Sequence, residues 1–163
     1  LRGVMRAAPH VILIGEVRDR ESMQAAIDLA GTGHLVLATL HANNCAETLD
    51  RIINMFQQEQ HKQVELDLSQ YLRAILAQRL VFGKDQKRVA AMEIMLNTPH
   101  ISELVKRGDV MGIKEAIMLS SERGIQSFDA ALLGLYKKER ISLEEALTNA
   151  DSRSNLEAKI NFG

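Results

Sequence analysis

Residues 11–40 constrain the fold more than any other part of the sequence, because they predict a strand, a helix and a second strand in direct succession. Four apolar β-formers run into Gly15 and Glu16, and residues 35–40 form a second apolar run. Continuous runs of this kind are typical of strands buried on both faces of a parallel sheet. Parallel strands joined in this way need a crossover connection, which is almost always right-handed. The sequence therefore predicts a βαβ unit and an α/β fold, with strands at residues 11–15 and 35–40.

The segment between the two predicted strands carries the signals of an amphipathic helix. Asp19 is a candidate N-cap, and Gly-Thr-Gly at residues 31–33 is a stop signal. Apolar residues recur at the helical spacing i, i+3, i+4 and i+7. They are Met23, Ala26, Ile27 and Ala30.

Glu16 and His41 directly follow the two predicted strands. Neighbouring parallel strands lie about 5 Å apart and end at the same edge of a sheet, so we expect both side chains to reach one ligand. Open α/β sheets bind ligands at this edge, where a partly desolvated carboxylate can act as a general base. Gly15 would let another group approach the backbone closely. The alternative is an ordinary pair of strand ends with a solvated glutamate and a hydrogen-bonded histidine.

The remaining sequence predicts helices interrupted by one β-hairpin. Apolar runs at residues 80–82 and 89–95, separated by glycine and polar residues, indicate the hairpin. We expect residues 1–97 to contain the sheet and residues 98–163 to form a small all-α bundle. The predicted helices are the end of one at residues 1–8, then 47–56, 58–79, 99–107, 109–121, 126–138, 142–149 and 153–160.

The composition excludes several classes of function. A net charge of −1 over 163 residues gives no general attraction to nucleic acid. No apolar run approaches the roughly 18 residues of a membrane-spanning helix. Cys45 is the single cysteine, so no internal disulfide can form and a reducing cytoplasm is the expected setting. His10, His61 and His100 lack metal-ligand spacing, and we predict no metal-ligating residues.

Two segments of the predicted βαβ unit resemble motifs of one protein family. Residues 11–19 (VILIGEVRD) resemble the atypical Walker B segment of the secretion ATPases that power type IV pili and type II secretion. Residues 31–42 (GTGHLVLATLHA) resemble the His box of the same family. Residues 78–95 resemble the hairpin of its retraction branch, and residues 124–129 (GIQSFD) resemble a GMQTxD-like turn. The end of the chain, residues 141–160, is more similar to the PilU-type branch than to the PilT-type branch.

The resemblance implies the C-terminal portion of a RecA-like ATPase core, followed by a helical C-terminal domain. It implies a P-loop ATPase that works as a hexameric motor for type IV pilus retraction and twitching motility, with ATP and Mg²⁺ as cofactors. Within that motor, Glu16 would polarise the water that attacks the γ-phosphate. His41 would contact the γ-phosphate or the same water.

Gly15, Arg18 and Thr39 are the further nucleotide-binding residues that the resemblance implies. Arg18 would bridge to phosphate or to a neighbouring subunit, or else pair with Asp19 or Glu21. The implied partners are further copies in a hexamer, a partner retraction ATPase and the pilus platform protein of the inner membrane, with no nucleic acid. The implied location is cytoplasmic, peripheral at the bacterial inner membrane.

Some features of the family are missing from this sequence. No Gly-x-x-x-x-Gly-Lys-[Ser/Thr] occurs, so we expect the phosphate-binding loop upstream of Leu1 and an inactive chain in isolation. The four-cysteine zinc motif of assembly and type II secretion members is also missing after residues 78–80, which favours retraction over assembly. His10 stands where the family often has aspartate, and residues 98–106 depart twice from the family's AIRNLIRE motif.

Three other functions remain open at this point. The first is a type II secretion or pilus assembly ATPase. The second is a non-hydrolysing accessory subunit that binds a partner retraction ATPase. The third is a helical interaction module, which would leave the convergence of Glu16 and His41 unexplained.

Overall fold

The described part of the chain comprises residues 9–120 and 122–162 of a computed structural model. The helix end predicted at residues 1–8 lies outside it. The described residues divide into two units. The first unit contains the described residues of Leu1–Ala42, Ala46–Ala74 and Asn97–Lys114. The second unit contains those of Asn43–Cys45, Ile75–Leu96 and Glu115–Gly163. This division differs from the predicted boundary at residue 97, because the predicted hairpin and the helices that follow it are shared differently between the units. An ATPase core at 1–97 and a C-terminal domain at 98–163 stay a prediction.

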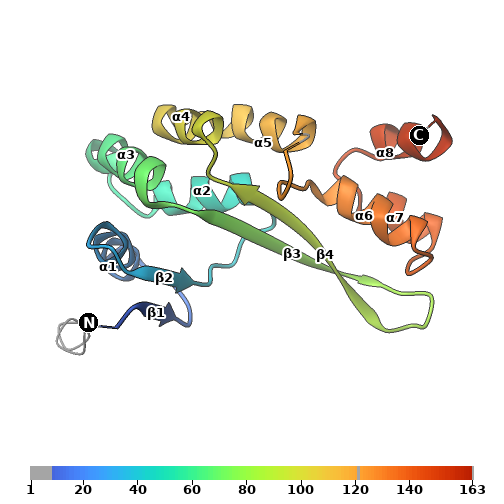
Figure 1. Ribbon diagram of the computed structural model, residues 1–163, viewed down its shortest axis with the longest axis horizontal. Coiled ribbons are helices and arrows are strands. Elements are labelled where there is room, and N and C mark those ends of the chain that lie inside the picture. The colour runs from blue at the N-terminus through green and yellow to red at the C-terminus, as the bar shows by residue number, and fades with distance from the viewer. Residues whose placement is uncertain (1–8, 121, 163) are drawn as a thin grey trace. The chain divides into compact units, whose positions relative to one another are not determined.

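In the first unit, strands β1 (Val11–Ile14) and β2 (Leu35–Ala38) pair in parallel. Helix α1 (Arg20–Gly31) connects them (Figure 1). Asp19 caps α1, since its carboxylate accepts a hydrogen bond from Ser22 N at 2.8 Å. The predicted βαβ unit is therefore confirmed, including the capping residue.

The predicted burial of these strands on both faces is wrong for this chain. Leu13 is 72% exposed and Leu37 is 49% exposed, whereas Ile12 is buried. The register places Val11 opposite Leu35 and Leu13 opposite Leu37, so these four exposed residues share one face. Helix α1 packs against β2. A single helix can cover only one face of a two-stranded sheet. Within the described part of this unit, the other face has no helix packed on it, which explains why its apolar residues are exposed.

Helices α2 (Cys45–Asn54) and α3 (His61–Tyr71) follow, joined through the short 3-10 helix η2 (Gln58–Gln60). The predicted helix at residues 47–56 corresponds to α2, and the four apolar residues along one of its faces are all buried. They are Leu49, Ile52, Ile53 and Phe56, the last just beyond the helix.

The predicted single helix at residues 58–79 is wrong, because α3 ends at Tyr71 and strand β3 (Ala74–Phe82) follows. In β3 the buried residues Ile75 and Ala77 alternate with exposed residues such as Leu76. This period of two fits a strand that pairs with a neighbour, here β4 (Arg88–Leu96). The hairpin is thus confirmed, with a first strand longer than predicted (Figure 1).

The side chain of Asn97 caps the C-terminal end of α3, although Asn97 lies well beyond this helix in the sequence. Its Nδ2 donates to the carbonyl oxygens of Ser69 and Leu72, each at 2.9 Å. The last carbonyls of a helix lack partners within the helix, so these bonds stabilise its end. Nothing in the local sequence of α3 carries this information.

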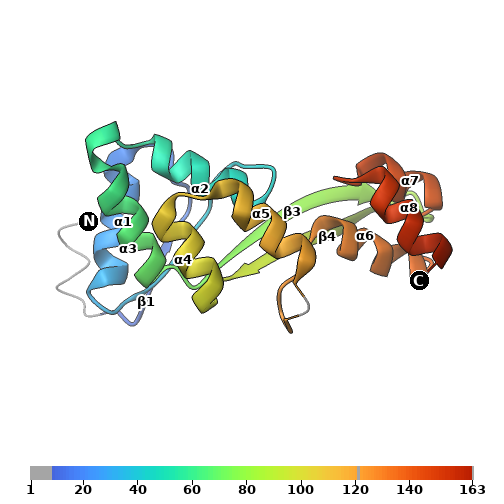
Figure 2. The same cartoon turned by 90° about the horizontal axis from the view of Figure 1, so that it is seen from above.

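Helices α4 (Pro99–Arg107) and α5 (Val110–Leu119) come next. Thr98 caps α4 with Pro99 in its first turn, and Gly108 ends it with a φ of 67°. Helix α4 packs against α3 within the first unit (Figure 2). Helix α4 has the predicted bounds, whereas α5 begins one residue later than the predicted range 109–121 and ends at Leu119.

In the second unit, helices α6 (Phe128–Lys137), α7 (Leu143–Asn149) and α8 (Arg153–Phe162) pack together, and α6 also packs against β4. Ser127 and Ser142 cap α6 and α7. The core of this unit contains side chains with at most 1% of their surface exposed. They include Phe128, Leu132, Ile141 and Leu156. No helix within the described ranges is long and apolar enough to cross a membrane.

Candidate functional site at the edge of the parallel strands

Glu16 and His41 meet at the carboxyl edge of β1 and β2, as the crossover geometry predicts. The distance from Glu16 Oε1 to His41 Nε2 is 3.1 Å. The Glu16 side chain is 28% exposed and the His41 side chain 84% exposed. The two groups therefore form a contact that remains open to solvent and to a ligand.

Arg18 is the third charged group at this edge. Its Nη2 lies 2.5 Å from Glu16 Oε2, so the two carboxylate oxygens of Glu16 have different partners. The structure therefore shows Arg18 paired with Glu16, not with Asp19 or Glu21 as in the alternative. The Asp19 carboxylate instead caps α1. The cluster Glu16, Arg18 and His41 combines one carboxylate, one guanidinium and one imidazole.

The backbone under this cluster is held across both strand ends. Val17 N donates to Thr39 O at 2.9 Å, and Thr39 Oγ1 donates to Gly15 O. Thr39 therefore orients the strand exit that carries Glu16. A Cβ placed on Gly15 would meet no atom within 4 Å, so space beside the strand exit is open, and close approach of a ligand there stays a prediction.

Charge around Glu16 keeps it ionised. The hydrogen bond from Arg18 lowers the pKa of the Glu16 carboxyl below its usual value, partial desolvation opposes this, and His41 adds a smaller lowering. Glu16 in turn raises the pKa of Arg18. A carboxylate that is ionised at neutral pH and has lone pairs to spare can still accept a hydrogen bond from water.

Two other histidines, His34 and His61, make local hydrogen-bonding contacts away from Glu16. His34 Nδ1 lies 3.0 Å from Thr32 Oγ1 and 3.1 Å from Leu29 O, and these contacts hold the turn before β2. His61 Nε2 lies 3.0 Å from Phe56 O. Within the described part of the chain, no group of three or more His, Cys, Asp or Glu residues is placed to hold a metal ion.

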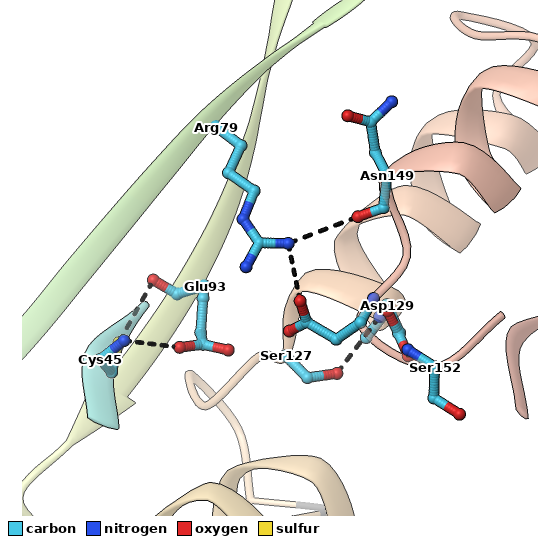
Figure 3. Close-up of polar contacts among 9 residues, drawn as sticks. Cys45, Arg79, Glu93, Ser127, Asp129, Asn149 and Ser152 are labelled. Carbon is cyan, nitrogen blue, oxygen red and sulfur yellow. Dashed lines mark hydrogen bonds and ion pairs between the residues drawn. The ribbon is translucent and has the colours of Figure 1, made fainter. Parts of the chain in front are cut away.

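Sequence reasoning missed two side chains that bind the backbone near this point of the sequence, one within each unit. Arg51 Nη1 donates to His41 O at 2.8 Å. Glu93 Oε1 accepts a hydrogen bond from Cys45 N at 2.7 Å (Figure 3). Glu93 had a readable signal, because it is a carboxylate on the same face of a strand as the apolar residues Ala91 and Met95.

The sequence profile described as "Type II/IV secretion system protein" matches residues 1–124, which is most of the chain. The chain belongs to this family. Among curated members, the "Type IV pilus ATPase PilU" of Pseudomonas aeruginosa is 48% identical over 164 residues, covering 100% of this chain and 43% of that protein. The "Type IV pilus retractation ATPase PilT" of the same organism is 39% identical over 155 residues, covering 95% of this chain and 45% of that protein.

A solved structure of a similar protein agrees with this assignment. The crystal structure of the pilus retraction motor PilT with bound ADP superposes with a TM-score of 0.84 at 33% identity, covering 96% of this chain and 44% of that chain. The expected RecA-like α/β class is thereby confirmed, as is the greater similarity to PilU than to PilT. The chain spans less than half the length of these relatives.

Proposed function

We propose that this chain is the C-terminal part of a hexameric motor that hydrolyses ATP to drive type IV pilus retraction and twitching motility. In this assignment residues 1–97 belong to the ATPase core and residues 98–163 to a C-terminal domain. The observation that carries the proposal is the meeting of Glu16, His41 and Arg18 at the carboxyl edge of two parallel strands. A mere helical interaction module would not need this arrangement.

Each residue of the cluster has a role in phosphoryl transfer. Glu16 accepts a hydrogen bond from the attacking water and directs it at the γ-phosphorus, since it remains ionised and sits at a strand end fixed by Thr39. His41 and Arg18 donate to the phosphate oxygens, where charge is spread in the transition state. Thr39 and Gly15 shape the backbone on which Glu16 is carried.

The donor set at this edge fits the γ-phosphate end of ATP. One anion for water and two cation-capable donors for phosphate are exposed together, and the space beside Gly15 is open. Mg²⁺, when bound, would neutralise charge on the β- and γ-phosphate oxygens. The sequence contains no Gly-x-x-x-x-Gly-Lys-[Ser/Thr], so these residues do not supply the cradle for the other phosphates.

Retraction is favoured over assembly or type II secretion because residues 81–88 contain no cysteine from which a zinc site could be built. The names of the two Pseudomonas aeruginosa relatives agree with a pilus role. We place the motor in the cytoplasm, peripheral at the inner membrane, with the pilus platform protein and a partner retraction ATPase as partners. Exposed lysines and arginines in the β3–β4 and α6–α7 turns would favour contact with the negatively charged lipid surface of that membrane.

The test is Glu16→Gln in the full-length protein. We expect loss of ATP hydrolysis with ATP binding retained, because the amide cannot act as the anionic acceptor for water while the phosphate donors remain. The matched control is Glu103→Gln, which changes a carboxylate that forms an exposed ion pair with Arg107 on α4. This control should leave hydrolysis unchanged. Hydrolysis by Glu16→Gln at the wild-type rate would refute the role of Glu16.

A second candidate is an accessory subunit that does not hydrolyse ATP and binds a partner retraction ATPase. The 48% identity to a protein named PilU, against 39% to one named PilT, favours keeping it. Purified full-length protein that hydrolyses no ATP alone, yet raises retraction by a partner ATPase, would support this candidate over the first. An active full-length protein would exclude it.

A further inference from the structure

Two turns of the second unit carry a concentration of basic side chains. One turn joins β3 to β4 at the end of the hairpin, and the other joins α6 to α7. Residues 82–88 and 137–140 contain six basic and two acidic residues, a local net charge of +4 in a chain whose net charge is −1. The six basic residues are all exposed. They are Lys84, Lys87, Arg88, Lys137, Lys138 and Arg140.

Hydrogen bonds within the second unit join the two turns into one surface. Lys84 N donates to Arg140 O at 3.0 Å, so the turns lie side by side (Figure 1). Beside this bond, Phe82 N donates to Glu145 Oε1 of α7 at 2.8 Å. Val81 and Ile141 flank these contacts and are at most 1% exposed. The packed interior of the unit therefore holds the backbone from which the basic side chains project.

The charge of these side chains is not neutralised within the described part of the chain. The ion pairs found in residues 9–120 and 122–162 involve none of the six. The β3–β4 turn is closed by the bond from Gly83 N to Lys87 O at 2.8 Å. Asp85, its one acidic residue, accepts a hydrogen bond from Lys87 N at 3.2 Å. The positive charge is thus available to an anionic partner.

Phe82 adds an apolar group to this surface. It is 52% exposed, and the Arg88 guanidinium carbon lies 5.2 Å from the centroid of its ring. An exposed aromatic ring beside cationic groups is the combination that interfacial segments place at the headgroup level of a bilayer. Two adjacent turns present a convex surface, which suits a lipid plane, whereas a nucleic-acid strand is bound along a groove with aromatic stacking platforms.

We propose that Phe82 and the six basic residues form a contact surface for a bilayer that contains anionic phospholipid. This inference rests on the proposed function, which places several copies in one ring at the inner membrane. A lysine or arginine near an anionic surface raises affinity by about fivefold, so one copy of this surface binds weakly and reversibly. Copies related by a cyclic axis face the same direction, and each contact after the first is intramolecular. The assembled ring therefore binds the bilayer far more tightly than a single chain.

The test is cosedimentation of the full-length protein with lipid vesicles. One set is phosphatidylcholine alone, and in the other set a third of the lipid is phosphatidylglycerol. We expect binding only to vesicles with phosphatidylglycerol. This binding should weaken as salt rises from about 0.1 M to about 1 M, because the Debye length falls from about 10 Å to about 3 Å.

The test variant carries Lys84→Gln, Lys87→Gln and Lys138→Gln together. We expect it to bind phosphatidylglycerol vesicles about 10- to 100-fold more weakly, since each lysine contributes up to about fivefold. Its fold should persist, because these lysines hold the two turns through backbone atoms. The matched control removes equal charge from exposed positions of the same unit outside the two turns. It carries Arg123→Gln, Arg153→Gln and Lys159→Gln.

The control should change vesicle affinity by less than about threefold, because charges more than a Debye length from the lipid are screened. Equal losses in the two triple variants would overturn the inference, as would wild-type binding that phosphatidylglycerol does not increase. Single-stranded RNA of mixed sequence is the competing ligand. If the wild type binds this RNA more tightly than the vesicles, and the test variant loses that binding, the surface belongs to nucleic acid and the inference is wrong.

ATP hydrolysis without vesicles separates this inference from the proposed function. The test variant should hydrolyse ATP at the wild-type rate, because none of its three lysines belongs to the Glu16 cluster. A wild-type protein that hydrolyses no ATP contradicts the proposed function, and the vesicle comparison then still decides the inference. An active wild-type protein that does not bind phosphatidylglycerol vesicles overturns the inference and leaves the ATPase assignment in place.

Discussion

Replacing Asp129 by alanine should strongly destabilise the second unit. Asp129 stands in the first turn of α6 and is 8% exposed. Its Oδ1 accepts a hydrogen bond from Asp151 N at 2.7 Å, and its Oδ2 accepts one from Ser152 N at 3.1 Å (Figure 3). One carboxylate thus holds the backbone between α7 and α8.

The magnitude follows from these two bonds. A hydrogen bond to a charged group contributes about 1.5–3 kcal/mol to the free energy of unfolding. The bond to Ser152 is longer and both bonds are partly buried, so we expect Asp129→Ala to cost about 3–4 kcal/mol. For a chain of this size that corresponds to a fall in Tm of roughly 10 °C. The nearby Arg79, which pairs with Asp151 at 2.7 Å and lies 3.9 Å from the Phe128 ring centroid, would keep part of the segment in place.

The assay is thermal and urea unfolding of the purified chain, followed by circular dichroism. Asp129→Asn should lose about half as much, because its amide keeps one carbonyl oxygen but turns a donor toward the second backbone amide. Glu103→Ala is the control, since an exposed i,i+4 pair contributes about 0.3–0.5 kcal/mol. A loss below about 1 kcal/mol in Asp129→Ala would show that these hydrogen bonds do not stabilise the unit as argued.

Three further predictions concern the first unit and the cysteine. The isolated chain should show no saturable ATP binding by calorimetry, because it lacks the phosphate loop; micromolar affinity would contradict this. Arg18→Met should raise the lowered pKa of Glu16 in an NMR titration. The contact between Glu16 and Arg18 stabilises the folded chain above the ordinary glutamate pKa of about 4.3, and this stabilisation is lost as pH falls through the pKa of Glu16 in the folded chain. An unchanged pKa of Glu16 in Arg18→Met would disprove the stated cause. Native Cys45 should resist iodoacetamide and react once urea unfolds the chain, because it is fully buried and its pKa is raised; rapid native labelling would argue against that burial.

The order of the elements and the convergence of Glu16 with His41 could be predicted from the sequence. Parallel strands in one crossover must end at the same edge, so the position of a residue after each strand decides where it arrives. The helix start at Asp19 was readable for a similar reason, because capping depends on residues within one turn. These features are local, and local sequence contains them.

Tertiary structure decided what depends on residues far apart in the chain. The end of α3 is stabilised by Asn97, 28 residues beyond Ser69, and the start of α2 by Glu93, 48 residues beyond Cys45. No periodic pattern records such partners, because a hydrogen-bonding side chain looks the same in sequence whether it meets water or a distant backbone group. The exposure of Leu13 and Leu37 was likewise unpredictable, since an apolar strand reports its own preference for burial and not whether another layer covers it.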